Sequence, residues 1–444
     1  MPGGARPLRR ILGLGFGLAI AFGGTVGVGI LRLPGTLAAT LGDARLIELF
    51  WVFGGIYALL GAVAVSELAA MLPRAGGFYV YARQAFGDGI GFVIGWSDWL
   101  NEVAALAYGA MTAVTFLGVL WPPANAYPRA ASILILSVFT ALHWVGLEVG
   151  STLTRIISLS VGIMLVVLIV ACFGGAAVPV PNLPLPLTAA ALPLASMGML
   201  AAVVTALRAV FVSYDGWYSP IYLAEESTDP GHTLPRSMIG GTVVLIALYV
   251  LMNVAILHAV PLAVLAVSKL PAADAARAVL PRGGDVLVTL ISLVTVLSLV
   301  NAVMLMTPRI LLAMGRDGLF VAKAADVSAG GTPRVALAIT SAAAVALILS
   351  GSFEQIVALA AVLFLFNYIS AYSALFVLRR REPRATRPYR AFGFPWSTGV
   401  VLIGCVLLLT AAILEDPRTA LIAAVLLAMC VPVYATIKRR RCSY

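Results

Sequence analysis

The sequence predicts an all-α polytopic membrane protein with twelve transmembrane helices in one domain, residues 1–444. Of its 444 residues, 61% are hydrophobic and only 11% are charged, whereas soluble domains carry about a quarter charged residues. The apolar residues form runs of the length that a helix needs to cross a bilayer, about 20 residues. Glycine and polar residues interrupt two of these runs at corresponding positions in two halves of the chain. This composition excludes a soluble enzyme, a disordered tail and a nucleic-acid-binding module.

The spans follow from the apolar runs between charged and helix-breaking residues. Ten spans form two halves of five, residues 12–173 and 191–378, and two further spans occupy residues 396–437. We expect the spans at 12–41, 45–72, 87–120, 129–147, 152–173, 191–223, 236–260, 284–314, 333–350, 354–378, 396–414 and 418–437.

Positive charge indicates the orientation in the membrane. With a cytoplasmic N-terminus, roughly twenty of the 29 Lys and Arg fall on inner segments and about six on outer ones, as the positive-inside rule requires. We therefore expect both termini in the cytoplasm. The positive-inside pattern accounts for the net charge of +10. We therefore expect the lipid bilayer as a partner and no nucleic acid.

Chemistry-bearing residues are sparse. The four cysteines and three histidines show no metal-ligand spacing. No phosphate-binding glycine loop precedes a lysine, and no nucleophile–base pair is recognisable. We expect no metal, no cofactor, no enzymatic activity and no ATP-driven pumping.

The first predicted span contains a run of glycines at its middle, Gly23-Gly24-Thr25-Val26-Gly27-Val28-Gly29. Each glycine costs a helix about 1 kcal/mol relative to alanine. Unwound backbone at membrane depth is tolerated where it is buried in protein or lines a cavity. The run therefore indicates either a binding site or close helix packing.

The sixth predicted span is interrupted at Phe211-Val212-Ser213-Tyr214-Asp215-Gly216-Trp217. Interrupted helices in corresponding positions of two halves predict a 5+5 inverted repeat with discontinuous helices 1 and 6 and a midplane site between them. The ends of half-helices expose N–H groups that suit an anion and C=O groups that suit a cation. A zwitterion would satisfy both.

Four motifs follow one another along the chain. Gly23 to Gly35 is similar to G-S-I-I-G-S-G-I-F-V-S-P-G, and Tyr214 to Trp217, followed by Glu225-Glu226 and Pro235-Arg236, resembles F-A-Y-D-G-W…E-E…P-R. The others are Ser66-Glu67-Leu68 with Pro73 to Gly77, and Pro308-Arg309 with Arg316-Asp317-Gly318. Taken in their order along the chain, the four motifs resemble those of the amino acid–polyamine–organocation superfamily, in its L-amino-acid-transporter-like branch.

The resemblance implies the leucine-transporter-type fold, ten core helices in two inverted repeats plus two C-terminal helices, moving L-amino acids by alternating access. It also implies two sets of substrate-binding backbone groups. N–H groups for the substrate carboxylate would come from Gly27, Val28 and Gly29. Carbonyl groups for its ammonium would come from Thr25, Val212, Ser213 and Asp215, with the Asp215 side chain bracing the break.

Two departures from the family pattern concern specificity. Val28 replaces a serine and removes a hydroxyl from the carboxylate cradle, and Val212 replaces the aromatic gate, although Phe211 is adjacent. Five residues near the breaks either line or gate the cavity or pack against neighbouring helices. These candidates are Phe211, Tyr214, Trp217, Asn367 and Tyr368.

The coupling mode is open between exchange and symport with H⁺ or Na⁺. Many sodium-independent relatives place a lysine in the fifth helix, but the three lysines here lie outside the predicted membrane core. Ser292, Thr295 and Ser298 have i+3 spacing on the eighth span. They offer an ion site or ordinary packing hydroxyls.

Charged residues inside spans are functional candidates because they are expensive there. Asp98 and Glu102 share one helical face and offer a proton relay or two partners for arginines. Arg208 could attract an acidic substrate or close an external gate with those acids. Glu67 suggests a gate or a loop anchor, and Arg32 is expected at the outer vestibule.

The leading function is a permease for L-amino acids, as an exchanger or an ion-coupled symporter. The alternatives are a transporter of amines or polyamines, and an amino acid sensor that does not transport. The outer loop after the third span lacks the cysteine by which animal relatives attach a heavy chain, so we expect no obligatory heavy-chain subunit. Short loops and an Arg-over-Lys bias fit a multi-pass protein of a bacterial inner membrane.

Overall fold

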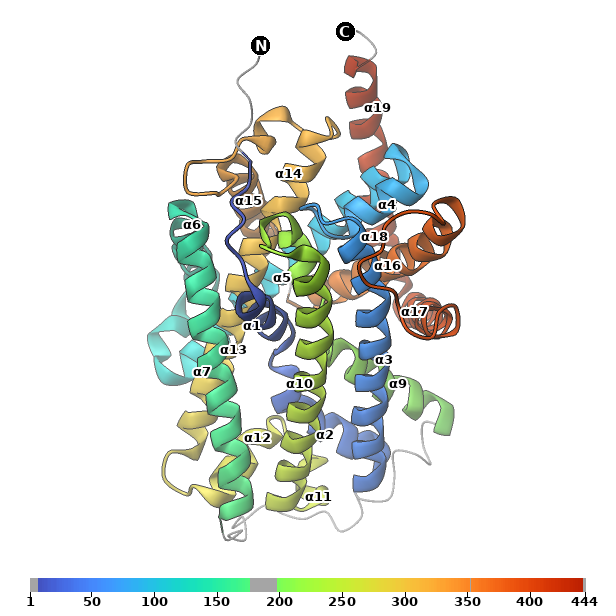
Figure 1. Cartoon of the computed structure of the whole chain (residues 1–444). Coiled ribbons are helices and arrows are strands. Elements are labelled where there is room, and N and C mark those ends of the chain that lie inside the picture. The colour runs from blue at the N-terminus through green and yellow to red at the C-terminus, as the bar shows by residue number, and fades with distance from the viewer. Residues whose placement is uncertain (1–6, 176–197, 352, 442–444) are drawn as a thin grey trace.

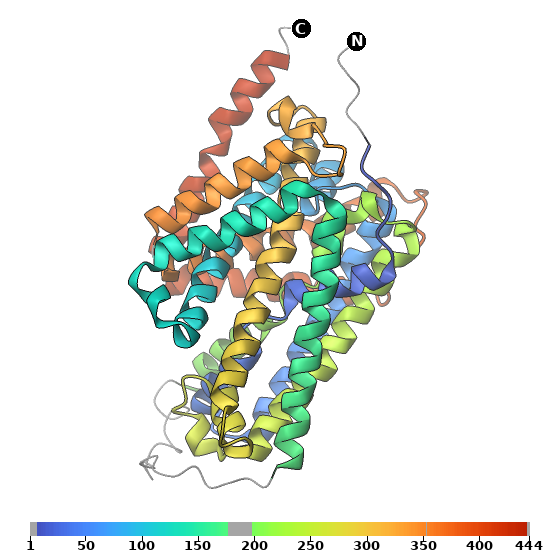
Figure 2. The same ribbon diagram turned by 90° about the vertical axis from the view of Figure 1, so that its left-hand side faces the viewer.

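A computed structural model describes residues 7–175, 198–351 and 353–441. Several long helices run side by side along one axis and others cross them at a steep angle, and the first and last described residues lie at the same end of the bundle (Figures 1 and 2). This end is called the terminal end below. The helices are α1 Leu14–Thr25, α2 Gly29–Leu41, α3 Ala44–Met71, α4 Phe78–Phe86, α5 Asp88–Leu120, α6 Pro128–Val145, α7 Leu147–Gly174, α9 Met199–Ser213, α10 Pro230–Ala259, α11 Leu262–Leu265, α12 Pro271–Val279, α13 Gly284–Met306, α14 Pro308–Arg316, α15 Arg334–Ser350, α16 Phe353–Arg381, α17 Trp396–Glu415, α18 Pro417–Ala428 and α19 Cys430–Arg441, with the 3₁₀ segments η1 Pro122–Ala126, η3 Ser219–Glu226 and η4 Ala322–Ala325.

The helix lengths identify a polytopic helical membrane protein. Within the described ranges, nine helices are long and apolar enough to cross a membrane, and the bent pair α1 and α2 makes a tenth candidate. Two shorter apolar helices, Ala202–Ser213 and Arg334–Ser350, lie where the sixth and ninth spans were predicted. The first seven residues of the predicted span 191–223 lie outside the described residues.

Three short helices were not predicted, because they lie in stretches interpreted as loops. Helix α4 follows two glycines in the left-handed region, Gly76 and Gly77. Helices α11 and α12 fill the connection between α10 and α13 at the end opposite the termini (Figure 1). Prolines at the first turns of α12 and α14 suit positions whose N–H groups have no helical partner.

The first predicted break is present. Helix α1 ends at Thr25, α2 begins at Gly29, and the two are bent by 43°. Val26 caps α1 in an extended conformation with ψ 110°. The glycine run therefore does interrupt the helix.

The second break also occurs, and it packs against the first. Helix α9 ends at Ser213, turns lead into η3, and Gly216 has a φ of +112°. A Cβ on Gly216 would collide with the backbone of Gly24, and a Cβ on Gly24 would collide with the side chain of Ser219. The two breaks thus touch through backbone atoms, which only glycine permits here.

The terminal end is tied together by pairs between distant segments. Leu12 exchanges backbone hydrogen bonds with Glu226 and Thr228 (both 3.0 Å), and Arg309 of α14 pairs with Glu226 of η3 at 2.8 Å. Arg316 binds Glu225 at 2.8 Å. These contacts join the N-terminal segment, η3 and α14.

A second cluster of charges anchors the connection between α16 and α17. The buried Glu67 carboxylate of α3 accepts hydrogen bonds from Arg379 (2.9 and 2.5 Å) and from the backbone N–H of Ala391 (2.7 Å), and Arg387 lies 3.0 Å away. Of the two predicted roles of Glu67, this geometry favours the loop anchor.

Candidate functional site

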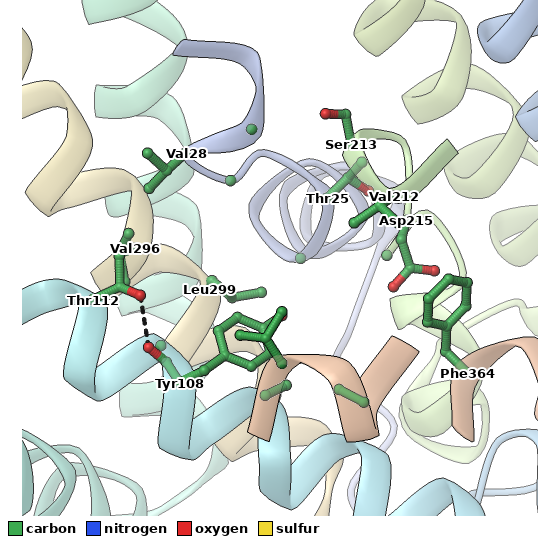
Figure 3. Close-up of a pocket in the computed structure, with 18 of the residues that line it drawn as sticks. Thr25, Val28, Tyr108, Thr112, Val212, Ser213, Asp215, Val296, Leu299 and Phe364 are labelled. Atoms are coloured by element: carbon green, nitrogen blue, oxygen red, sulfur yellow. Dashed lines mark hydrogen bonds between the residues drawn. The ribbon is translucent and has the colours of Figure 1, made fainter. Parts of the chain in front are cut away.

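A cavity of about 530 Å³ lies where the two broken helices meet. Its walls come from the α1–α2 break, the end of α9 and the following turn, α5, α13 and α16 (Figure 3). Arg32, Thr36 and Lys269 line it and are exposed, and Val212 is 47% exposed. The cavity therefore opens toward the end opposite the termini.

All seven residues predicted to bind substrate line this cavity. Figure 3 shows Val28 on one side and Val212, Ser213 and Asp215 on the other. The open space at Gly27 would accept a side chain, since the nearest atom to an added Cβ is the Thr25 carbonyl oxygen at 3.9 Å. The seven residues are Thr25, Gly27, Val28, Gly29, Val212, Ser213 and Asp215.

Two helix ends of opposite polarity face the cavity. Helix α2 begins at Gly29 with no side-chain cap, so its first N–H groups point toward the break without a capping partner. Helix α9 ends at Ser213, where the Tyr214 N–H bonds back to the Val210 and Phe211 carbonyls; a carbonyl oxygen has two lone pairs, so these groups can accept a second hydrogen bond. The first helix end suits an anion and the second suits a cation.

Tyrosines brace the break at both sides. Tyr368 of α16 donates a 2.5 Å hydrogen bond to the Asp215 carboxylate, in line with the bracing role expected for that side chain. Tyr249 of α10 donates to the Thr25 carbonyl at 3.3 Å. A carbonyl oxygen has two lone pairs, so Thr25 can still accept a hydrogen bond from a substrate.

Four of the five wall or gate candidates lie behind the break rather than on the main cavity. They line a separate void of about 30 Å³, because the chain turns after Ser213 and directs these rings toward α3 and α16. Phe211 stacks on Tyr57 with centroids 4.2 Å apart, and Trp217 stacks on Tyr368 at 5.7 Å. Tyr214 donates to the Trp51 carbonyl at 3.1 Å. This placement favours packing.

The fifth candidate, Asn367, is buried and lines neither cavity. Its amide lies 3.5 Å from the Asp98 carboxylate. Among the tenth-span residues that do line the main cavity is Phe364, three positions earlier.

The remaining cavity wall was missed by the sequence analysis. Its residues are apolar side chains on one face each of α5, α13 and α16. Their i+3 and i+4 spacing is the same as that of core residues, so periodicity does not separate wall from core. They include Ala105, Val296, Leu299, Val303, Met306, Val357, Ala360 and Phe364, with the aromatic Tyr108.

The hydroxyl groups of the candidate ion site are buried and have no hydrogen-bond partner in the part of the chain that the structure describes. Ser292 and Ser298 are six residues apart on α13, a rise of about 9 Å, so one ion cannot touch both. Ser298 faces the first break, because its Oγ and that of Ser158 both lie within 3 Å of the point where Gly23 would carry a Cβ.

Asp98 and Glu102 of α5 form no ion pair with any described residue, so the ion-pair interpretation of these two acids is wrong for the described structure. Glu102 accepts hydrogen bonds from Asn101 (3.1 Å) and Tyr218 (3.2 Å), and Asp98 accepts from Tyr222 (2.8 Å). The predicted external gate between these acids and Arg208 is also absent there, since Arg208 pairs with Glu415.

Fold and site together define a multi-pass helical membrane protein with a substrate-sized cavity between two broken helices. A family model described as amino acid permease matches residues 17–435, and the chain belongs to that family, within the superfamily that its motifs indicated. It is therefore a transporter and not an enzyme.

Two relatives illustrate the family range. A serine/threonine exchanger of Bacillus subtilis is 24% identical over 446 residues, which cover 98% of each chain. An uncharacterized transporter of Mycobacterium tuberculosis is 29% identical over 313 residues, 70% of this chain and 67% of the relative.

Proposed function

We propose that this protein is a secondary active transporter that moves L-amino acids across a bacterial inner membrane by alternating access. In this proposal it has twelve spans, two inverted repeats within 12–173 and 191–378, and both termini in the cytoplasm. The observation that carries the proposal is the cavity at which the N-terminal end of α2 and the C-terminal end of α9 face the same space.

The zwitterionic part of an amino acid fits this arrangement. The N–H groups of Gly27, Val28 and Gly29 would hold its carboxylate. The carbonyl groups of Thr25, Val212, Ser213 and Asp215 would hold its ammonium. Backbone groups recognise both charges without placing an unpaired side-chain charge in the membrane.

The charge at the cavity mouth favours amino acids over polyamines. Arg32 and Lys269 line the mouth, are exposed, and have no ion-pair partner among the described residues. Their positive field would attract a carboxylate and repel a polycation. Serine and threonine are the first substrates to test, because the Bacillus relative is named for them.

The cavity opens away from the terminal end, and ion pairs close that end. With cytoplasmic termini, this arrangement corresponds to an outward-facing state. The buried hydroxyls of Thr295 and Ser298, which have no partner among the described residues, support a sodium site as one coupling mode, and proton symport and strict exchange are the others. We expect neither a cofactor nor a heavy-chain subunit to be required.

The decisive experiment measures counterflow in proteoliposomes. Purified protein is reconstituted with unlabelled amino acid inside, and uptake of labelled L-serine, L-threonine and other L-amino acids is followed. We expect uptake that requires internal substrate or an imposed ion gradient, and none with Gly27→Leu protein. Uptake of a polyamine but of no amino acid by folded protein would refute the proposal, and binding without any uptake would indicate a sensor.

A further inference from the structure

Two carboxylates face the cavity, and neither has a cationic partner among the described residues. Glu102 and Asp215 both line it, yet Glu102 is only 2% exposed. The Glu102 Oε1 atom accepts from Asn101 and Tyr218, whereas no described residue donates to Oε2. An ionised carboxylate in this setting lacks the compensating charge that burial in a membrane protein demands.

A third carboxylate lies one helical turn nearer the terminal end. Asp98 is completely buried, and no described residue donates a hydrogen bond to its Oδ2 atom. Its other oxygen accepts from Tyr222, whose ring lies 6.0 Å from that of Tyr218. Asp98 and Glu102 are therefore each bonded to a tyrosine of the segment that follows the second break.

The substrate carries fewer positive charges than the cavity has carboxylates, so Asp215 and Glu102 have different roles. A zwitterionic amino acid brings one ammonium group, and the proposed ammonium position lies at the break beside Asp215. Glu102, which reaches the cavity from α5, is left without a cation when substrate binds. We propose that Glu102 is the proton-binding residue through which this protein couples amino acid transport to a proton gradient. This inference rests on the proposed transport of amino acids.

Among the described residues, the surroundings of Glu102 contain no fixed positive charge that would replace the proton. Helix α13 contributes apolar cavity residues, His143 of α6 bonds Asn301 at 3.1 Å, and Arg309 of α14 is occupied by Glu226. The exposed cations Arg32 and Lys269 lie at the mouth. The titratable groups nearer to Glu102 are all acids or phenols: Asp98 and Tyr108 of α5, Asp215, Tyr218 and Tyr222 of the segment after α9, Tyr81 of α4 and Tyr368 of α16.

Tyr218 links Glu102 to the broken helix. Its hydroxyl belongs to the broken segment, whereas Glu102 belongs to α5, which packs along α13 and α16. A hydrogen bond of 3.2 Å joins them. When Glu102 loses its proton it can only accept hydrogen bonds, and two negative carboxylates, Glu102 and Asp215, then share one cavity. Protonation of Glu102 therefore favours a conformation in which this cavity is closed around both carboxyl groups.

The test compares driven uptake with counterflow in the same proteoliposomes. For wild-type protein, we expect an inward proton gradient to accumulate the labelled amino acid and a protonophore to abolish accumulation. Glu102→Gln mimics the protonated state, so counterflow should stay within about threefold of wild type while gradient-driven accumulation falls at least tenfold and the pH dependence of transport flattens. Glu102→Asp should restore a pH-dependent profile. Asp285→Asn, an exposed acid at the start of α13, is the matched control and should behave as wild type.

Each of the other results would identify which of the two proposals is wrong. If the wild-type protein shows counterflow but its uptake does not respond to a proton gradient, the proton assignment is wrong and the transporter proposal stands. If the wild-type protein shows no counterflow, the transporter proposal is wrong. If Glu102→Gln selectively loses lysine or 1,5-diaminopentane while keeping proton-driven uptake, Glu102 binds a second substrate ammonium and the proton assignment is wrong. Should Glu102→Gln not fold, the response of wild-type uptake to the proton gradient, together with Glu102→Asp, decides the question.

Discussion

Arg309 and Glu226 form a two-hydrogen-bond ion pair, with Nε–Oε2 and Nη2–Oε1 distances of 2.8 and 3.0 Å, although the two side chains are only 2% and 0% exposed. Arg309 also donates to the Leu305 carbonyl of its own helix. The Glu226 backbone carbonyl accepts from Leu12. One residue pair thus joins three segments that close the terminal end.

Removing one member of this pair should cost far more than removing both. Arg309→Gln or Glu226→Gln alone leaves a buried unpaired charge, and each should lower stability by about 3–5 kcal/mol. The double variant should recover most of that loss. Thermal unfolding of the four proteins in detergent measures the coupling, and single variants as stable as wild type would contradict the assigned burial.

Gly27→Leu should abolish transport without unfolding the protein. A leucine there projects into open cavity space and fills the proposed carboxylate position. The matched control is Gly24→Ala, whose methyl group would meet Ser219 and should reduce stability by about 1–3 kcal/mol. Uptake and unfolding temperature are measured for both, and wild-type exchange by the leucine variant would remove the site from this position.

Tyr368→Phe removes the hydroxyl that donates to Asp215 and leaves the ring stacked on Trp217. A hydrogen bond to a charged group contributes about 1.5–3 kcal/mol. We therefore expect transport efficiency to fall about tenfold or more. Tyr372→Phe is the control, because this neighbouring ring stacks on Tyr368 without contacting Asp215. Equal effects of the two variants would argue against bracing.

The cations at the mouth should act through long-range attraction. Arg32→Gln and Lys269→Gln should each raise KM about threefold at low ionic strength, and the difference should shrink as salt rises. Arg45→Gln neutralises an exposed arginine outside the cavity lining and should leave KM unchanged. KM is compared at several salt concentrations, and a salt-independent effect would point to direct substrate contact instead.

Sequence reasoning located both breaks because glycine and acidic residues are conspicuous in an apolar helix. The seven residues from Thr25 to Asp215, which the family resemblance implied, line one cavity, and their roles stay predictions. Sequence reasoning left open whether Tyr214 and Trp217 form a cavity wall or pack against helices, because the direction of a ring after a break depends on the turn at Gly216. Apolar walls such as Val296 looked like core, and the tyrosine partners of Asp98 and Glu102 come from a distant segment that one-dimensional spacing cannot pair.

The anchor at Glu67 has a consequence for biosynthesis. Arg379 follows Glu67 by 312 residues, which at translation rates of roughly 5–20 residues per second takes about 15–60 s. During that interval the carboxylate of the second predicted span has been synthesised but its guanidinium partner has not. This corner of the protein can assemble only after α16 has emerged from the ribosome, so nascent chains that stop before α16 must leave Glu67 hydrated, protonated or held by another factor.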